Sequence, residues 1–147
     1  MQSNQERILA LDYGTVRIGV AVSDPLALFA IPLDYVKNDS RKWEFFGSLL
    51  SLYHCTHIIL GLPLNLKGLE SQKAEEIRTF ANELHEKFKV QVELVDERFT
   101  TVIAHRTILS TTPKKSAREK RKEFVDSRAA AILLEGYLNA RAKRKSC

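Results

Sequence analysis

RILALDYGTVRIGVAVSD, residues 7–24, is the stretch of sequence that decides the fold of this chain. An apolar strand pattern runs to Asp12, a short turn containing glycine follows, and a second strand pattern extends from Arg17 to Ser23. Because the connection is short, the two strands are expected to pair antiparallel. A carboxylate beside a buried strand is costly unless a cation compensates it. Asp12 therefore predicts a nearby Lys or Arg side chain or a divalent metal ion.

The rest of the chain alternates between strand and helix patterns. A third strand is expected at residues 30–36, and Ser40 has the residue type of a helix N-cap. The further elements expected are a strand at 57–61, a helix at 74–88, a strand at 90–96, a helix from Thr100 or Thr101 to Leu109, and a last helix. The capping-box pair Ser116 and Glu119 predicts that this last helix begins near Ala117. Three closely connected strands followed by strand–helix–strand crossovers predict an α/β fold, with a mixed sheet, helices on its faces and the first strand in its middle.

The composition is that of an ordinary globular protein. With 147 residues, of which 44% are hydrophobic, the chain is long enough for a single domain over residues 1–147, with a basic tail at about 141–147. Its only cysteines, Cys55 and Cys147, argue against a disulfide framework and against a cysteine-based zinc site. Since no apolar run approaches a membrane span and the N-terminus is polar, we expect a cytoplasmic protein with no membrane partner.

Three acidic residues occupy positions that suggest a shared site. Asp12 and Glu97 follow strands, and ligands of such sheets gather at the carboxyl ends of strands. Asp126 lies on the apolar face of the last helix if that helix begins near Ala117, whereas a later start makes Asp126 or its neighbour the N-cap. Carboxylates from three elements suit a hard cation such as Mg²⁺, which also accepts phosphate oxygens and assists phosphodiester hydrolysis.

Basic residues are concentrated in two segments of this chain, whose net charge is +5. The denser segment holds Lys114, Lys115, Arg118, Lys120, Arg121 and Lys122. So many cations suit a polyanion, and we expect Lys120, Arg121 and Lys122 to grip a nucleic-acid backbone from a mobile loop or a frayed helix start. The second segment, residues 141–145, is explained more simply as a solvated tail.

Other residues near the expected site have a simple explanation beside the functional one. Arg17 and Arg98 flank the acidic residues, where they either hold phosphates or only neutralise carboxylates. Asn65, after the strand at 57–61, is a candidate contact to the nucleic-acid backbone. Tyr13 and Trp43 have the chemistry to stack on a base, but Trp43 fits the apolar face of its helix and is expected in the core.

Four motifs, in this order, resemble the RuvX family, also called YqgF: DYGTVRIGVAVSDPL at 12–26, IILGLPLNLKG at 58–68, ELVDERFTT at 93–101 and VDSRAAAILLEGYL at 125–138. The resemblance covers almost the whole chain. It implies an RNase H-like fold with a five-stranded sheet of strand order 3-2-1-4-5. It also implies a hydrolase acting on ester bonds, a nuclease for 5′-end maturation of pre-16S rRNA. By motif, Asp12, Glu97 and Asp126 are then the catalytic residues and hold Mg²⁺ or Mn²⁺.

One position departs from the family pattern. The family commonly has Lys directly after its last acidic residue, whereas this chain has Ser127 and then Arg128. Either Arg128 supplies that charge to the nucleic acid from a shifted position, or the contact is lost. The segment LKGLESQKA also departs from the usual acidic, Gly-rich form of the family. These departures concern contacts to the substrate and not the metal site.

Two other functions compete with the nuclease of ribosome biogenesis. The first is a Holliday-junction resolvase in DNA recombination and repair, which needs two active sites and hence a dimer. The second is a nucleic-acid-binding module in transcription without catalysis. The retained carboxylates argue against the second, because a binder of polyanions gains nothing from buried acids. The expected partners are pre-16S rRNA and ribosomal precursor particles, with branched DNA as the alternative, bound by a monomer or weak dimer.

Overall fold

The computed structural model describes residues 7–63, 72–96 and 118–145. Its elements are β1 (Arg7–Asp12), β2 (Arg17–Ser23), β3 (Ala30–Lys37), α1 (Lys42–Leu52), β4 (Cys55–Leu62), α2 (Gln72–Phe88), β5 (Gln91–Asp96) and α4 (Arg118–Lys145). Every strand expected from the sequence is present, with bounds that differ by no more than two residues at either end. The helix expected up to Leu109 lies outside the described residues.

The strands form one mixed sheet in the order β3-β2-β1-β4-β5, which confirms the expected topology. The tight connections make β1, β2 and β3 antiparallel neighbours. In contrast, β4 lies parallel to β1, and β5 lies parallel to β4. Each of these strands follows a helix, α1 before β4 and α2 before β5, which returns the chain to the edge of the sheet where β1 begins. The central strand is therefore β1, and the carboxyl ends of β1, β4 and β5 share one edge.

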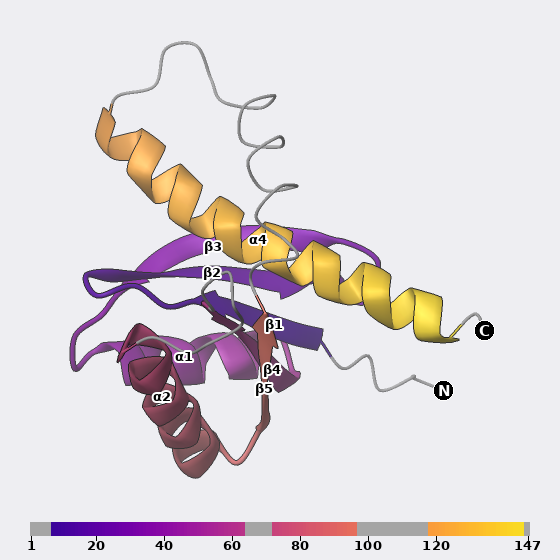
Figure 1. The fold of residues 1–147 in the computed structure, drawn as a ribbon, viewed down its shortest axis with the longest axis horizontal. Coiled ribbons are helices and arrows are strands. Elements are labelled where there is room, and N and C mark those ends of the chain that lie inside the picture. Colours follow the sequence, from indigo (N-terminus) through magenta and orange to yellow (C-terminus); the bar gives the residue numbers. More distant parts are fainter. Residues whose placement is uncertain (1–6, 64–71, 97–117, 146–147) are drawn as a thin grey trace.

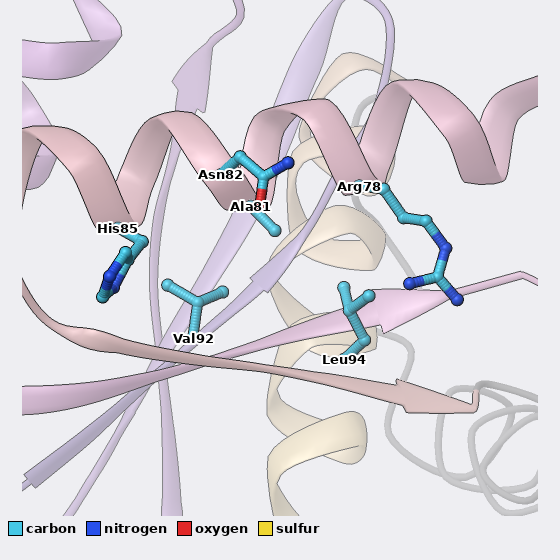
Figure 2. Close-up of a pocket in the computed structure, with 6 residues that line it drawn as sticks. All are labelled: Arg78, Ala81, Asn82, His85, Val92 and Leu94. Atoms are coloured by element: carbon cyan, nitrogen blue, oxygen red, sulfur yellow. The ribbon is translucent and has the colours of Figure 1, made fainter.

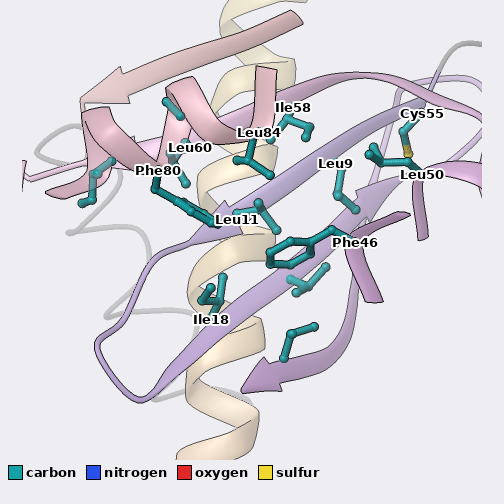
Figure 3. Packing of buried hydrophobic residues seen from close by; sticks show 14 of the residues in the cluster. Leu9, Leu11, Ile18, Phe46, Leu50, Cys55, Ile58, Leu60, Phe80 and Leu84 are labelled. Atoms are coloured by element: carbon teal, nitrogen blue, oxygen red, sulfur yellow. The ribbon is translucent and has the colours of Figure 1, made fainter. Parts of the chain in front are cut away.

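Helices cover both faces of this sheet (Figure 1): α1 and α2 lie on one face and α4 on the other. Alternate residues of each strand enter the two layers. In β1, Leu9 and Leu11 face α1 and α2, whereas Ile8 and Ala10 face α4. The α1/α2 layer is built around Phe46 (Figure 3).

The helix bounds correct two expectations. Ser40 is not the N-cap of α1, since the cap is Arg41 and no side chain caps the helix. The reason is a competing turn one residue earlier, in which the Asp39 carboxylate accepts the Arg41 N–H at 2.9 Å and the Asp39 carbonyl accepts the Lys42 N–H at 3.1 Å. In addition, the basic residues from Arg141 to Lys145 are not a tail but the last turn of α4.

Candidate nuclease site

Asp12 is the last residue of β1, the central strand of the sheet. The residue is half-buried and has an interaction within the protein. By strand alternation it points to the same face as Ile8 and Ala10, which pack in one cluster with Ala130 and Leu134 of α4. Asp12 is thus at the carboxyl edge of the sheet, on the side covered by α4.

Glycines occupy both positions beside Asp12 in the sheet. Its antiparallel partner in β2 is Gly19. In β4, the pairing of Leu11 with Leu60 puts Gly61 at the level of Asp12. Because neither neighbour has a side chain, no cross-strand group crowds the Asp12 carboxylate, and a ligand has room above the sheet. Both glycines stand in the motifs quoted above, but the sequence pattern alone did not assign them this role.

The turn after Asp12 is held by a residue that sequence analysis missed. Asn38 follows β3, and its side-chain Nδ2 donates to the Gly14 carbonyl at 2.8 Å while its backbone N–H donates to the Val16 carbonyl at 2.9 Å. Gly14 itself has no room for a side chain, since a Cβ atom would collide with the carbonyl oxygen of Arg17. The path from Asp12 to Arg17 is therefore fixed by Gly14 and Asn38.

Arg17 is on the same side of the sheet as Asp12. It begins β2 and alternates with Ile18, which belongs to the opposite layer. Its guanidinium Cζ lies 5.2 Å from the ring centroid of Tyr35, a cation–π contact that holds the half-buried side chain. Of the cations predicted to flank the acidic residues, Arg17 is the one whose position is described, and it lies on the face of Asp12.

Helix α4 decides between the two expectations for Asp126. The helix begins at Arg118, one residue after the expected Ala117, so Asp126 is inside it and does not cap it. Asp126 stands four residues before Ala130, which packs on the sheet; the Asp126 side chain itself is outside the described residues. Arg128, two residues later, is half-buried and has an interaction within the protein.

Several predicted site residues lie outside the described part of the chain. They are Asn65, Glu97 and Arg98, together with the side chains of Lys120, Arg121 and Lys122, whose backbone forms the start of α4. Within the described residues, no three His, Cys, Asp or Glu side chains form a cluster suited to a metal. The three-carboxylate site therefore stays a prediction. The half-buried oxygen donor at Asp12, with glycines at either side, fits a hard cation such as Mg²⁺.

Asp96 does not join Asp12, although it ends a neighbouring strand at the same edge. It alternates with Val95, which packs towards α4, and shares its side of β5 with Leu94, which packs against the α1/α2 layer. Asp96 and Asp12 consequently point to opposite faces of the sheet. Asp96, the first residue of the acidic pair at 96–97, thus lies on the side of the sheet that α2 covers.

The two aromatic residues considered for base stacking belong to the core. The Tyr13 ring centroid is 5.0 Å from that of Phe80, and the Trp43 centroid is 5.7 Å from the same ring. Both side chains are half-buried against the α1/α2 layer. The expectation that Trp43 packs in the core is confirmed, and Tyr13 packs beside it.

Comparison with known proteins bears on what this edge of the sheet does. The model of the RuvX family, described as a Holliday junction resolvase, matches residues 6–140. The chain belongs to the RuvX family. Asp12, Glu97 and Asp126 all lie within the matched residues.

Curated relatives match over nearly the full length of the chain. A protein of Sulfurihydrogenibium sp. (strain YO3AOP1), named "Putative pre-16S rRNA nuclease", is 41% identical over 135 residues, which cover 90% of each chain. A protein of Myxococcus xanthus (strain DK1622) with the same name is 43% identical over 136 residues, covering 91% of this chain and 88% of the relative. The RuvX resemblance inferred from four motifs is confirmed.

Solved structures share the fold of this RuvX protein. The Thermus thermophilus RuvC structure in complex with a Holliday junction substrate has a TM-score of 0.53 at 14% identity, with 94% of this chain and 96% of that chain covered. The yeast mitochondrial Holliday junction resolvase Ydc2 has a TM-score of 0.56 at 15% identity, with 97% and 81% covered. These likenesses confirm the RNase H-like fold of the resolvases.

Within the described residues of this RuvX protein, none of the helices has the length and apolar character to span a membrane.

Proposed function

We propose that this protein is a metal-dependent endonuclease that hydrolyses phosphodiester bonds in structured RNA, in 5′-end maturation of pre-16S rRNA. The observation that carries the proposal is the position of Asp12. A half-buried carboxylate ends the central strand, between two glycines, on the face that α4 covers. The names of relatives that match about nine-tenths of this chain support pre-16S rRNA as the substrate. The cytoplasm, where ribosomal precursors are processed, is the proposed place of action.

In the proposed site, Asp12, Glu97 and Asp126 supply the oxygen ligands of Mg²⁺ or Mn²⁺. When bound, the metal supplies a Lewis acid for a phosphate oxygen and lowers the pKa of an attacking water molecule. In the hydrolysis, the water oxygen bonds to phosphorus, the bond from phosphorus to the leaving ribose oxygen breaks, and that oxygen takes up a proton. The carboxylates orient the reacting groups and compensate positive charge at the edge of the sheet.

Helix geometry supports the inclusion of Asp126. In an α-helix, residues at spacings of four and eight share one face. Asp126 has this spacing from Ala130 and Leu134, both of which pack on the sheet near the side of Asp12. We therefore expect the Asp126 carboxylate to lie over the sheet edge that carries Asp12. Glu97, which directly follows β5, would approach from the third element.

The proposed contacts to RNA surround this edge. Arg17 lies on the Asp12 face and suits a phosphate near the cleavage position. Asn65, Arg98 and Arg128 are proposed as further backbone contacts. The cations Lys120, Arg121 and Lys122, in the first turns of α4, extend the basic surface along the substrate.

A Holliday-junction resolvase is the second candidate, because the family model carries that description and solved resolvases share the fold. Symmetric cleavage of a four-way junction needs two sites in one assembly, so this candidate predicts a dimer. The nuclease of rRNA maturation is compatible with a monomer or a weak dimer. Substrate preference and mass in solution therefore separate the two functions.

The direct test is cleavage of a 5′-extended 16S rRNA precursor, with a four-way DNA junction as the competing substrate. We expect the wild type to cut the precursor with Mg²⁺ and not with EDTA. In Asp12→Asn, cleavage should fall by about 100-fold or more, because a neutral amide is a poor ligand for a hard divalent cation. Asp34→Asn, an exposed position in β3, is the matched control and should cut normally.

Three results would count against the proposal. Full activity of Asp12→Asn at saturating Mg²⁺ removes Asp12 from the site. Cleavage that persists in EDTA removes the metal. Preference of the wild type for the DNA junction over the RNA precursor assigns the protein to the second candidate.

A further inference from the structure

A pocket of about 270 Å³ lies between α2 and the edge strand β5, on the opposite face of the sheet from α4. Four residues of α2 form one wall, and two residues of β5 form the other (Figure 2). The lining residues are Arg78, Ala81, Asn82, His85, Val92 and Leu94. This volume is just below the range of about 300–1,000 Å³ typical of whole small-molecule sites, so it suits one ring-sized group.

The lining combines an apolar floor with side chains that form hydrogen bonds. Val92 and Leu94, both half-buried, offer apolar surface, and the small side chain of Ala81 leaves space on the helix side of the pocket. Arg78 and Asn82 are exposed beside them and carry hydrogen-bond donors. None of the lining residues is acidic, and Arg78, the cation of the lining, also has an interaction within the protein. The pocket therefore favours a ligand with an anionic end and a flat or apolar body.

His85 is held in place by a bond that also defines its tautomer. Its Nδ1 lies 2.9 Å from the Val90 carbonyl oxygen. Because a carbonyl oxygen only accepts, Nδ1 carries the proton and donates it, and in the neutral ring Nε2 is then an acceptor. The pocket thus has an oriented imidazole at one end, besides the amide of Asn82, which both donates and accepts.

The pocket is directed along β5 towards the carboxyl edge of the sheet. Figure 2 shows His85 near Val92 and Arg78 near Leu94. Leu94 stands two residues before Asp96, the last residue of β5, and β5 runs parallel to β4, which is itself parallel to β1. The Arg78 end is consequently nearer to the edge at which Asp12 ends β1 than the His85 end is.

We propose that this pocket binds one nucleotide of the RNA strand that extends from the cleavage site across the edge of the sheet. The base packs on Val92 and Leu94, its polar edge bonds to Asn82, and its phosphate pairs with Arg78. His85 Nε2 accepts a hydrogen bond from the base or the ribose 2′-hydroxyl. This subsite rests on the proposed nuclease function and extends it to a substrate in which a single-stranded segment leaves the cleavage position around β5.

The lining favours RNA over an extended peptide, the other ligand that an edge strand can take. A peptide added to β5 would gain most from backbone hydrogen bonds, for which Arg78, Asn82 and His85 are not needed. A nucleotide uses all of them, because it presents a flat base, polar edges and an anionic phosphate together. A peptide is therefore an outcome that the test must distinguish.

The test measures binding without cleavage. A single-stranded RNA heptanucleotide is titrated into the full chain in EDTA and followed by fluorescence anisotropy. We expect Arg78→Gln to weaken binding by about tenfold, since hydrogen bonds to charged groups are the stronger ones. Asn82→Ala should weaken it by about threefold to tenfold. The matched controls are Arg141→Gln and Asn139→Ala, at exposed positions of α4 on the other face, and they should bind as the wild type does.

A second measurement locates the ligand. In ¹⁵N-labelled protein, titration with mononucleotides should shift the Asn82 side-chain amide and the backbone amides of Val92 and Leu94. Wild-type affinity of both pocket variants overturns the proposal, even if the protein cleaves rRNA precursors as proposed. So do shifts caused by inorganic phosphate alone, or by a Val- and Thr-rich hexapeptide but not by RNA. If the variants lose RNA affinity but the wild type never cleaves the precursor, the subsite is supported and the proposed catalytic function is refuted.

Discussion

Single polar side chains fix the turns that connect the strands of this protein. The Asp24 carboxylate accepts the backbone N–H groups of Leu26, Leu28 and Phe29 at 3.1, 2.7 and 2.6 Å. These bonds, the one from Phe29 above all, lower the pKa of Asp24. Asn38 fixes the turn after Asp12, because its side-chain amide and its backbone N–H donate to carbonyl oxygens of that turn. At the scale of residues, hydrogen bonds between side chains and the backbone determine where the strands end and where Asp12 and Arg17 stand.

Cys55 gives a prediction at this scale. Burial raises the pKa of its thiol to about 11, and the nearby Arg7 only partly opposes this. The raised pKa means that the buried neutral thiol stabilises the fold below its ordinary pKa of 9.0 and that this contribution is lost as the pH rises towards 11. In Cys147→Ser, whose single thiol is Cys55, we expect labelling by a disulfide reagent at pH 8 to be about 100-fold slower in the native protein than in denaturant. Equal labelling rates would show that the thiol is accessible.

Helix α4 is the element that joins the two halves of the sheet. Its apolar residues pack on β1 and β2, and a polar link attaches it to β5. In this link, Tyr137 donates from its hydroxyl to Glu93 Oε1 at 3.0 Å, and His57 Nε2 lies 3.4 Å from the same oxygen. Since α4 also carries Asp126, the link helps to set the position of the helix relative to Asp12.

Tyr137→Phe tests this link, because it removes the hydroxyl and keeps the ring. We expect the free energy of unfolding to fall by about 1 kcal/mol, the usual net value of one hydrogen bond. Urea denaturation followed by circular dichroism measures the change. Tyr53→Phe, which removes a hydroxyl from a half-buried ring in the other layer, is the control. A loss no larger than that of the control would mean that the Tyr137 hydroxyl does not hold the helix.

The start of α4 gives a prediction about electrostatics. Changing Lys120, Arg121 and Lys122 to Gln should weaken RNA binding at low salt and lower the slope of log K against log salt by about 2 to 3 units, if each cation neutralises one phosphate. The triple variant with Lys87, Lys89 and Arg141 changed to Gln removes the same charge elsewhere and controls for net charge. Filter binding over a range of salt concentrations measures both. An unchanged slope in the first variant would make the segment a solvated surface.

The whole molecule consists of two packed layers that share one sheet. The α1/α2 layer contains an aromatic group in which Phe46 lies 6.0 Å from Phe80 and 6.2 Å from Trp43, centroid to centroid. The α4 layer is built from small and aliphatic residues around Leu134. Because each strand contributes side chains to both layers, loss of either layer would expose one whole face of the sheet.

This arrangement predicts that residues 1–147 unfold as a single domain. Phe46→Ala should lower the free energy of unfolding by about 3–5 kcal/mol and Leu134→Ala by about 2–5 kcal/mol, since both side chains are fully buried. In each variant, Trp43 fluorescence reports the α1/α2 layer and far-UV circular dichroism reports all helices. The two urea transitions should coincide. Separate transitions in Leu134→Ala would show that the α4 layer is an independent unit.

The sequence by itself determined the elements and the class of the fold. The short apolar runs in RILALD and RIGVAVS, and the helical stripe through Ile77 and Leu84, are local patterns, so they predict local structure well. The four motifs also predicted the RuvX family, to which the chain belongs. The local pattern was wrong at Ser40, where the Asp39 carboxylate competed for the same backbone groups.

Only the tertiary structure decided how the residues of the site are arranged. It directed Asp12 towards α4 and Asp96 to the opposite face, and it put Asp126 inside a helix that covers the Asp12 side. It also brought Gly19 and Gly61 beside Asp12 and formed the pocket between α2 and β5. Glu97, Arg98 and Asn65 lie outside the described residues, so their part of the site stays a prediction. These features depend on which strands become neighbours, and long-range packing determines that pairing where local periodicity does not.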